Sequence, residues 1–166
     1  MTDKNEIPNG KDGKNFRPNV AAIVLSAKYP EKCEVFIASR TDVENAWQFP
    51  QGGIDKGESA REALFRELEE EIGTRDVKII AEYPEWVSYE FPPAIAKKMY
   101  PYDGQIQKYY LVKLNSGAKI DISTHHTPEF SEYKFVPTKN IYDYITFFKR
   151  TVYKQVLKYF KSEGYI

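Results

Sequence analysis

The sequence predicts an α/β protein in which a mixed β-sheet lies between helices. Three observations support this fold class: short apolar runs separated by turn residues recur along the chain, an amphipathic helix is expected near its middle, and a second helix is expected at its C-terminal end. The chain has 166 residues, the usual size of one packed domain. We therefore expect a mobile, polar N-terminal arm over residues 1–15 and a single domain over residues 16–166.

Most of the expected strands are apolar or aromatic and are bounded by turn residues. Residues 20–25 form a continuous apolar run, and residues 107–114 alternate and are rich in tyrosine. The segment 92–104 contains three prolines and is expected to be a long loop, a kind of segment that often carries specificity. The full set of expected strands or strand edges is 20–25, 34–38, 77–83, 85–91, 107–114 and 133–136.

The two expected helices have clear boundary or packing signals. Ser59 is followed three residues later by Glu62, which is a capping-box signature, and Gly73 can adopt the left-handed conformation that ends a helix. The C-terminal helix has an apolar stripe, with lysines over much of the remaining surface. The stripe consists of Phe148, Val152, Val156 and Phe160, with Tyr153 and Leu157 beside it.

Composition excludes several classes of function. Twenty-four basic and 24 acidic residues give zero formal net charge, which argues against non-specific binding to DNA or RNA phosphates. Cys33 is the single cysteine, so an intramolecular disulfide and a cysteine-based zinc site are excluded. The N-terminal residues are polar, and no apolar run approaches the length of a membrane span. We therefore expect a cytoplasmic protein with no membrane partner.

Three glutamates in the central helix point to metal chemistry. At about 100° per residue, Glu67, Glu70 and Glu71 lie within a narrow arc beside the apolar stripe. Carboxylates at this spacing repel one another, and burying them costs free energy unless a cation neutralises them. Oxygen ligands suit Mg²⁺ or Mn²⁺, ions that commonly also hold substrate phosphates. The alternative is that the glutamates simply solubilise an exposed helix face.

The residues around these glutamates follow a longer pattern. Gly52 stands six positions before Glu58, Glu58 stands eight before Arg66, and the run RELEEEIG then covers residues 66–73. This resembles the Nudix box, G-x5-E-x7-R-E-U-x-E-E-x-G-U, where U is aliphatic. Thr74 occupies the last aliphatic position, a departure that touches none of the proposed ligands.

The resemblance implies roles for the residues of the box. Glu67, Glu70 and Glu71 resemble the metal-binding and catalytic glutamates of the family, and the Gly52 carbonyl resembles a further ligand for two or three Mg²⁺ or Mn²⁺ ions. Glu58 and Arg66 match residues that support the site.

Outside the box, Glu129 in the run TPEF matches a carboxylate that approaches the metals; the alternative is a turn acid that follows a proline.

Further blocks of sequence are similar to one subgroup of the family. In order along the chain they are FRPNV at 16–20, WQFPQGG at 47–53, GQIQK at 104–108, TPEF at 127–130 and FKRTVY at 148–153. These blocks resemble the bacterial RNA pyrophosphohydrolases, a group that overlaps the dinucleoside polyphosphate hydrolases. The resemblance implies a Nudix-type α/β/α sandwich.

Two cations and four further side chains are expected to bind the substrate. Arg17 and Lys149 match positions that contact a 5′-polyphosphate, and fixed cations bind phosphate oxygens with charge-assisted hydrogen bonds. Either could instead be merely exposed. A pocket for bases is expected from amide and aromatic side chains, for which simple packing is the alternative. Its residues are Gln105, Gln107, Phe148 and Tyr89.

Two other features bear on specificity and on metal binding. Thr41 follows Arg40 where related sequences often have a second basic residue, so the preference for the RNA's second base is expected to differ. His125 and His126 have no further nitrogen ligands nearby in sequence and are expected to be surface residues rather than a metal site.

The resemblance therefore implies a metal-dependent pyrophosphohydrolase that removes pyrophosphate or phosphate from the 5′-triphosphate or diphosphate end of RNA. The product would be a 5′-monophosphate, an entry point for mRNA decay. The nearest alternative is a diadenosine polyphosphate hydrolase, and a more distant one is a non-catalytic nucleotide-binding module.

Overall fold

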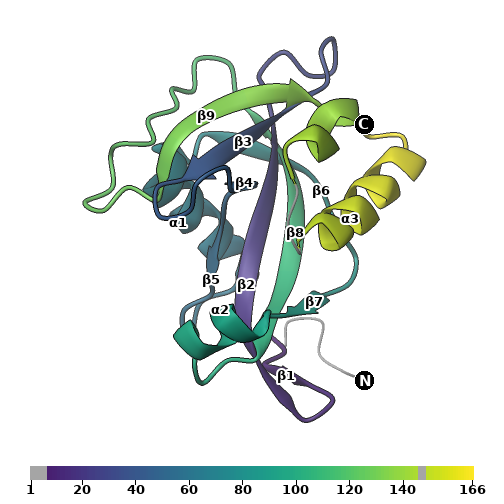
Figure 1. Ribbon diagram of the computed structural model, residues 1–166. Coiled ribbons are helices and arrows are strands. Elements are labelled where there is room, and N and C mark those ends of the chain that lie inside the picture. The colour runs from purple at the N-terminus through teal and green to yellow at the C-terminus, as the bar shows by residue number, and fades with distance from the viewer. Residues whose placement is uncertain (1–6, 146–148) are drawn as a thin grey trace.

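The computed structural model describes residues 7–145 and 149–166. Its strands form a mixed sheet with the central order β4-β3-β2-β8-β6 (Figure 1). These strands are Trp47–Gln48, Glu34–Arg40, Lys14–Leu25, Gly104–Leu114 and Val77–Glu82. The remaining strands pair with inner members of this order: β1 (Gly10–Lys11) and β5 (Gln51–Gly53) with β2, β7 (Val87–Glu90) with β8, and β9 (Phe130–Pro137) with β3.

Two helices cover opposite faces of the sheet. α1 (Ala60–Ile72) packs on the face formed by Val20, Ala22 and Val24, whereas α3 (Arg150–Ser162) packs on the face formed by Ala21, Ile23 and Leu25. Successive side chains of a strand point to opposite faces, so an uninterrupted apolar run is what a doubly covered strand requires. The predicted mixed sheet between helices is confirmed.

The central pair of strands determines where the site forms. β2 and β8 run parallel over ten residue pairs, from Phe16 opposite Gly104 to Leu25 opposite Lys113. On its other side β2 changes neighbour: near its C-terminal end it pairs with β3, and at residues 19–21 it pairs with β5. This change of neighbour places Gly52 and Gly53 of β5 opposite Val20 and Asn19 of β2, in the segment of the chain that leads into α1.

The boundaries of α1 are set by its own sequence, as predicted. The Ser59 hydroxyl accepts a hydrogen bond from the Glu62 backbone N–H at 3.1 Å, which satisfies one of the free donors of the first turn. Gly73 ends the helix with φ of 77°, and its N–H donates to the Glu69 carbonyl. Glycine adopts this left-handed conformation without the steric cost that other residues incur.

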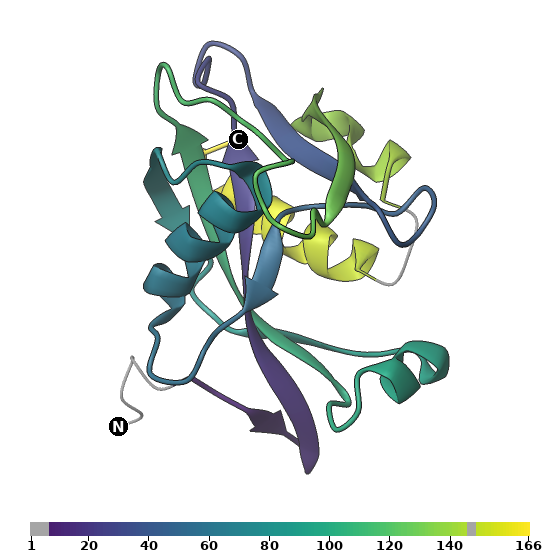
Figure 2. The same cartoon turned by 90° about the vertical axis from the view of Figure 1, so that its left-hand side faces the viewer.

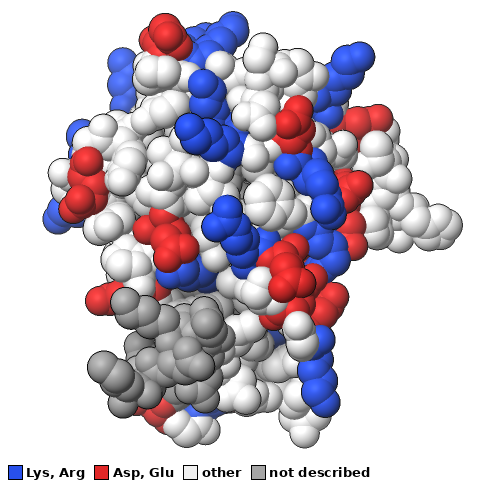
Figure 3. All heavy atoms as spheres, turned by 180° about the vertical axis from the view of Figure 1, so that it is seen from behind, with Lys and Arg blue, Asp and Glu red and all other residues white. Residues whose placement is uncertain are grey.

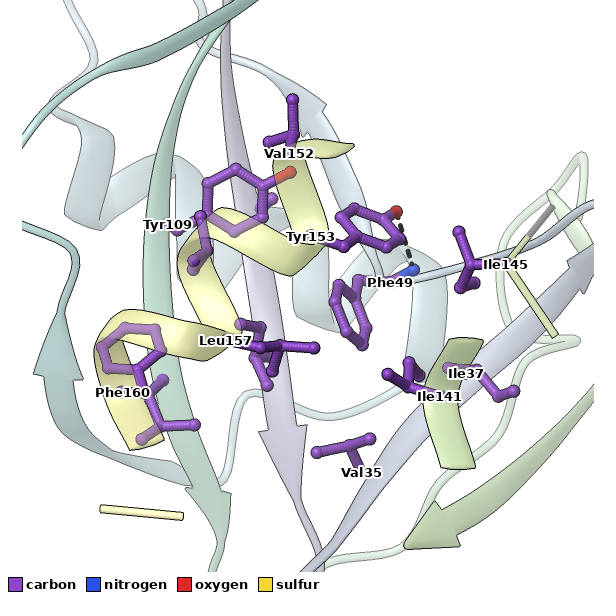
Figure 4. Close-up of a cluster of buried hydrophobic side chains, with 14 of the residues drawn as sticks. Val35, Ile37, Phe49, Tyr109, Ile141, Ile145, Val152, Tyr153, Leu157 and Phe160 are labelled. Carbon is purple, nitrogen blue, oxygen red and sulfur yellow. Dashed lines mark hydrogen bonds between the residues drawn. The ribbon is translucent and has the colours of Figure 1, made fainter. Parts of the chain in front are cut away.

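α3 fixes the segment that leads into β5. Its residues Val152, Tyr153, Val156, Leu157 and Phe160 are buried, as the apolar stripe predicted. The Tyr153 ring lies 4.3 Å from the Phe49 ring between centroids, and its hydroxyl accepts a hydrogen bond from the Phe49 N–H at 3.2 Å (Figure 4). The last helix therefore supports the loop that precedes the glutamate helix.

The structure differs from the expected elements in several places. A short helix, α2 (Pro93–Lys98), lies in the segment 92–104 that was expected to be a long loop, and a 3₁₀ turn, η1 (Thr138–Asp143), lies where no element was predicted. β2 begins at Lys14 and pairs with β1, so part of the expected N-terminal arm is a hairpin. The Asn15 N–H also donates to Asp103, which explains why pairing extends beyond the apolar run.

The surface and the helices agree with the composition. Seen from behind, lysine and arginine side chains are interspersed with aspartate and glutamate (Figure 3), as zero net charge suggests. Over the part of the chain that the structure describes, no helix has the length and apolar character needed to span a bilayer.

Candidate active site

A cavity of about 880 Å³ brings the predicted glutamates together with the predicted phosphate-binding cations. Residues of α1, β5 and the segment 125–129 border it, and α2 and the loop 41–46 contribute further lining. In Figure 2 this loop and α2 project on the same side of the sheet. The cavity thus combines an acidic border with a surface large enough for a nucleotide-sized ligand.

Arg66 joins the glycine loop to α1. Its guanidinium contacts both carboxylate oxygens of Glu58 at 2.7 and 2.8 Å, and it donates to the Gly53 carbonyl at 2.9 Å. It also contacts Glu67 at 2.8 Å and Glu70 at 3.3 Å. This bidentate geometry is specific to arginine. Glu58 and Arg66 therefore have contacts suited to the supporting role that the box implies.

Glu67 lies directly against Gly52. A Cβ atom added to Gly52 would lie 1.9 Å from the Glu67 carboxyl carbon, so a side chain at position 52 would occupy the space of that carboxylate. The pKa of Glu67 is raised to about 7: burial is the main cause, Arg66 opposes it, and the charges of Glu70 and Glu129 act in the same direction as burial. Position 52 therefore needs a residue without a side chain, because the Glu67 carboxylate occupies that space.

Glu71 is the most buried of the three glutamates. It is 7% exposed, and one of its oxygens accepts a hydrogen bond from the Gln51 N–H at 3.1 Å. Burial raises the pKa of Glu71 well above its usual value, and the neighbouring Glu129 carboxyl and Glu67 charge act in the same direction. Glu129, although 58 residues distant in sequence, therefore belongs to the same acidic cluster.

The donor set fits a divalent cation that binds together with substrate. Within residues 7–145 and 149–166 no three acidic, histidine or cysteine side chains form a cation cage by themselves. Magnesium commonly takes only one or two carboxylates and completes its shell with waters and substrate phosphates. Burial is the main cause of the raised pKa values of Glu67 and Glu71, and nearby carboxylates add to it; a cation between these groups would stabilise their charged forms.

Both predicted cations line the cavity. The Arg17 guanidinium lies over Gly53, since a Cβ atom added there would be 2.4 Å from Nη2. Lys149 is buried, and its ammonium donates to Gln48 Oε1 at 3.2 Å. The pKa of Lys149 is lowered to about 7: burial is the main cause, the charge of Arg40 acts in the same direction, and Glu71 and Glu129 oppose both. A substrate phosphate beside this ammonium would stabilise its charged form, which burial disfavours.

Three of the predicted base-pocket residues, Tyr89, Gln105 and Gln107, are held by side-chain hydrogen bonds. Together with Asn19 they are called the floor of the cavity. The Tyr89 hydroxyl donates to Gln105 Oε1 at 2.7 Å, and both residues line the cavity. Gln107 is fully buried and is not part of the lining; its amide donates to Asn19 at 2.8 Å and to Gln51 at 3.0 Å. Gln107 is therefore placed to hold the floor rather than to touch a ligand. Phe148, the fourth predicted residue, lies outside the described residues.

Several lining residues were missed in the sequence. Phe91, Ile95 and Met99 form an apolar wall that depends on the unexpected helix α2, so no local signal identified them. Asn19 lies two residues after Arg17 in the block FRPNV, but its place in the cavity lining depends on the strand that both residues share. His125, expected at the surface, is exposed but lines the cavity.

Comparison with known proteins identifies the family. Residues 15–156 match the model of the NUDIX domain. The chain is 70% identical over 152 residues to the RNA pyrophosphohydrolase of a Nitratiruptor species, covering 92% of this chain and 97% of that protein. It is 56% identical over 153 residues to the RNA pyrophosphohydrolase of Helicobacter pylori, covering 92% and 98%.

Solved structures agree on the fold. A C. elegans Ap4A hydrolase has a TM-score of 0.67 at 18% identity, covering 89% of this chain and 99% of that one. The E. coli dihydroneopterin triphosphate pyrophosphohydrolase has a TM-score of 0.66 at 18% identity, covering 84% and 95%. With an intact box between Gly52 and Gly73 and a family match over most of its length, the chain belongs to the Nudix hydrolase family.

Proposed function

We propose that this protein is an RNA pyrophosphohydrolase that converts the 5′-triphosphate or diphosphate end of RNA into a 5′-monophosphate. One observation carries the proposal: the acidic cluster of Glu67, Glu71 and Glu129 and the cations Arg17 and Lys149 border one cavity. The curated relatives at 55–70% identity that bear this name support the choice of substrate.

The phosphate chain would lie between the acidic and the basic parts of the cavity. Arg17 and Lys149 would donate charge-assisted hydrogen bonds to phosphate oxygens, orienting the chain. Tyr89 and Gln105 would contact the first nucleoside, because amides bind base edges and aromatic rings stack on bases.

Divalent metal ions are used by Nudix hydrolases. We propose Mg²⁺ or Mn²⁺, two or three per site with substrate, held by Glu67, Glu70, Glu71, Glu129 and the Gly52 carbonyl. When bound, the metal supplies polarisation of phosphate oxygens and neutralises charge on the leaving group.

A carboxylate of the acidic cluster would accept the proton of the attacking water. Glu67, Glu70, Glu71 and Glu129 are the candidates for this role, because all four line the cavity. Arg66 would not enter the reaction; it would hold Glu67 and the glycine loop in register.

The test is hydrolysis of a short 5′-triphosphorylated RNA with Mg²⁺ by wild type, Glu71→Gln and Glu62→Gln. Loss of a general base or metal ligand costs about 10²- to 10⁴-fold in rate, so Glu71→Gln should fall by that factor. Glu62 is exposed on the same helix and outside the cavity lining, so Glu62→Gln should keep the wild-type rate. Equal rates for all three proteins would contradict the proposed site.

A further inference from the structure

The floor of the cavity contains a buried hydrogen-bond donor that has no partner. Among the described residues, Asn19 Nδ2 is the one buried side-chain nitrogen or oxygen without one, and Asn19 is 1% exposed. A buried donor left unpaired is rare in folded proteins because it loses its water without compensation. Asn19 is also one of the residues that line the cavity.

The side-chain amides around Asn19 are assigned as one consistent hydrogen-bond network. In it the buried Tyr109 hydroxyl donates to Gln107 Oε1 at 2.7 Å, and the Gln107 nitrogen faces away from Tyr109. That nitrogen lies 2.8 Å from Asn19 Oδ1 and 3.0 Å from Gln51 Oε1. Since the Gln107 nitrogen only donates, both partners must present oxygen to it. The Asn19 nitrogen is thereby left as a donor.

The surroundings of this donor are those of a phosphate site. Asn19 lies opposite Gly53 in the pairing of β2 with β5, and the Arg17 guanidinium lies over that same glycine. Arg17 and Asn19 are two apart on β2, so their side chains share a face of the sheet. The neighbouring Gly52 contacts the Glu67 carboxylate. Asn19 thus stands beside a fixed cation and close to the acidic cluster.

We propose that Asn19 is a substrate-binding residue whose side-chain N–H₂ donates to a phosphate oxygen of the substrate, next to Arg17. This inference rests on the proposed function, because it assigns a further contact in the same site. A phosphate oxygen is small enough to reach an almost inaccessible nitrogen and carries the charge that Arg17 attracts. Gln107 and Tyr109 act as positioning residues, since they fix the orientation of the Asn19 amide.

Two substitutions separate donation from charge. Asn19→Asp keeps the oxygen that accepts from Gln107 but replaces the donor with an acceptor. Asn19→Leu has a similar size, removes both polar atoms and adds no charge. The matched control is Asn15→Asp, an exposed position on the same strand that is outside the cavity lining. Thermal unfolding of each variant identifies those that remain folded.

The measurement is binding of inorganic tripolyphosphate with Mg²⁺ by calorimetry. Loss of one hydrogen bond to a charged group predicts at least about tenfold weaker binding for folded Asn19→Leu and a larger loss for Asn19→Asp, with Asn15→Asp binding like wild type. A probe without a base excludes a contact to the nucleobase. Wild-type affinity in folded Asn19→Leu, or no binding by the wild type, would overturn the proposal.

Parallel hydrolysis of 5′-triphosphorylated RNA separates this proposal from the function on which it rests. Active wild type with unchanged tripolyphosphate binding in the variants would refute the role of Asn19 alone. Inactive wild type would refute the proposed function.

Discussion

Replacing Gly52 with alanine tests whether the Glu67 carboxylate is positioned by contact with the glycine loop. The new Cβ atom would lie 1.9 Å from the Glu67 carboxyl carbon, whereas carbon atoms in contact stay about 3.5 Å apart. The carboxylate would therefore have to move by about 1.6 Å. A displacement of about 1 Å in an active site can cost about 100-fold in rate, so Gly52→Ala should lower kcat by about 100-fold or more.

Stability should change little in this variant. Gly52 does not have a positive φ, and the atom that must move is the end of a flexible side chain. The control is Gly117→Ala, where φ is 88° and a Cβ atom would meet nothing within 4 Å. That substitution should cost about 1–2 kcal/mol for a left-handed residue, or roughly 2–8 °C in Tm, with kcat unchanged.

The assay is steady-state hydrolysis of 5′-triphosphorylated RNA with Mg²⁺, beside thermal unfolding of both variants. Full kcat in Gly52→Ala would refute the reasoning, because it would show that the position of Glu67 does not depend on Gly52. A large fall in Tm for Gly52→Ala would instead show that the substitution disturbs the fold.

Three further predictions follow from the ion pairs, the acidic cluster and the buried lysine. Arg66→Lys loses the bidentate contact with Glu58 and should lower the free energy of unfolding by about 2 kcal/mol. The control Arg75→Lys, in an exposed ion pair, should lower it by less than about 1 kcal/mol. Equal Tm values for the two variants in thermal unfolding would contradict this prediction. Without metal, the folded-state pKa of Glu67 is raised to about 7, so the folded protein binds more protons than the unfolded chain between the ordinary carboxyl pKa and that value. The contribution of Glu67 to stability should therefore fall as pH rises through this window. Glu67→Gln should reduce the slope of Tm against pH, and an unchanged slope would refute the raised pKa of Glu67. Lys149→Met removes a cation from the cavity and should raise KM for triphosphorylated RNA more than it lowers kcat; a KM equal to that of wild type would exclude a contact between Lys149 and the substrate.

The helix that carries the glutamates was predictable from sequence because its determinants are local. Ser59 and Gly73 set its ends through contacts within the helix itself. The apolar stripe of α3 was also predictable, because helical spacing alone indicated which residues would be buried. The resemblance to the Nudix box brought Glu58 and Arg66 together as supporting residues, and the structure places them in direct contact.

Other parts of the site depend on contacts between segments distant in sequence. α2 is short and has no buried residue, so it shows no apolar stripe. The proline in its first turn and Lys97 and Lys98 in its last turn are local signals that could have identified it. In the sequence Asn19 is a polar residue at the start of an apolar run. Its hydrogen bond with Gln107 depends on the parallel register of β2 and β8, which no local pattern predicts. The helix that carries the glutamates is thus determined by local sequence, whereas the proposed substrate-binding residues are brought together by strand pairing.

The central claim is that this cavity processes RNA 5′ ends. The most direct measurement compares kcat/KM for a short 5′-triphosphorylated RNA and for a diadenosine polyphosphate, at equal concentrations and with Mg²⁺. We expect a clearly higher value for the RNA and loss of that activity in Glu71→Gln. A higher value for the dinucleotide would contradict it and would assign the Gln105 and Tyr89 surface to a second nucleoside.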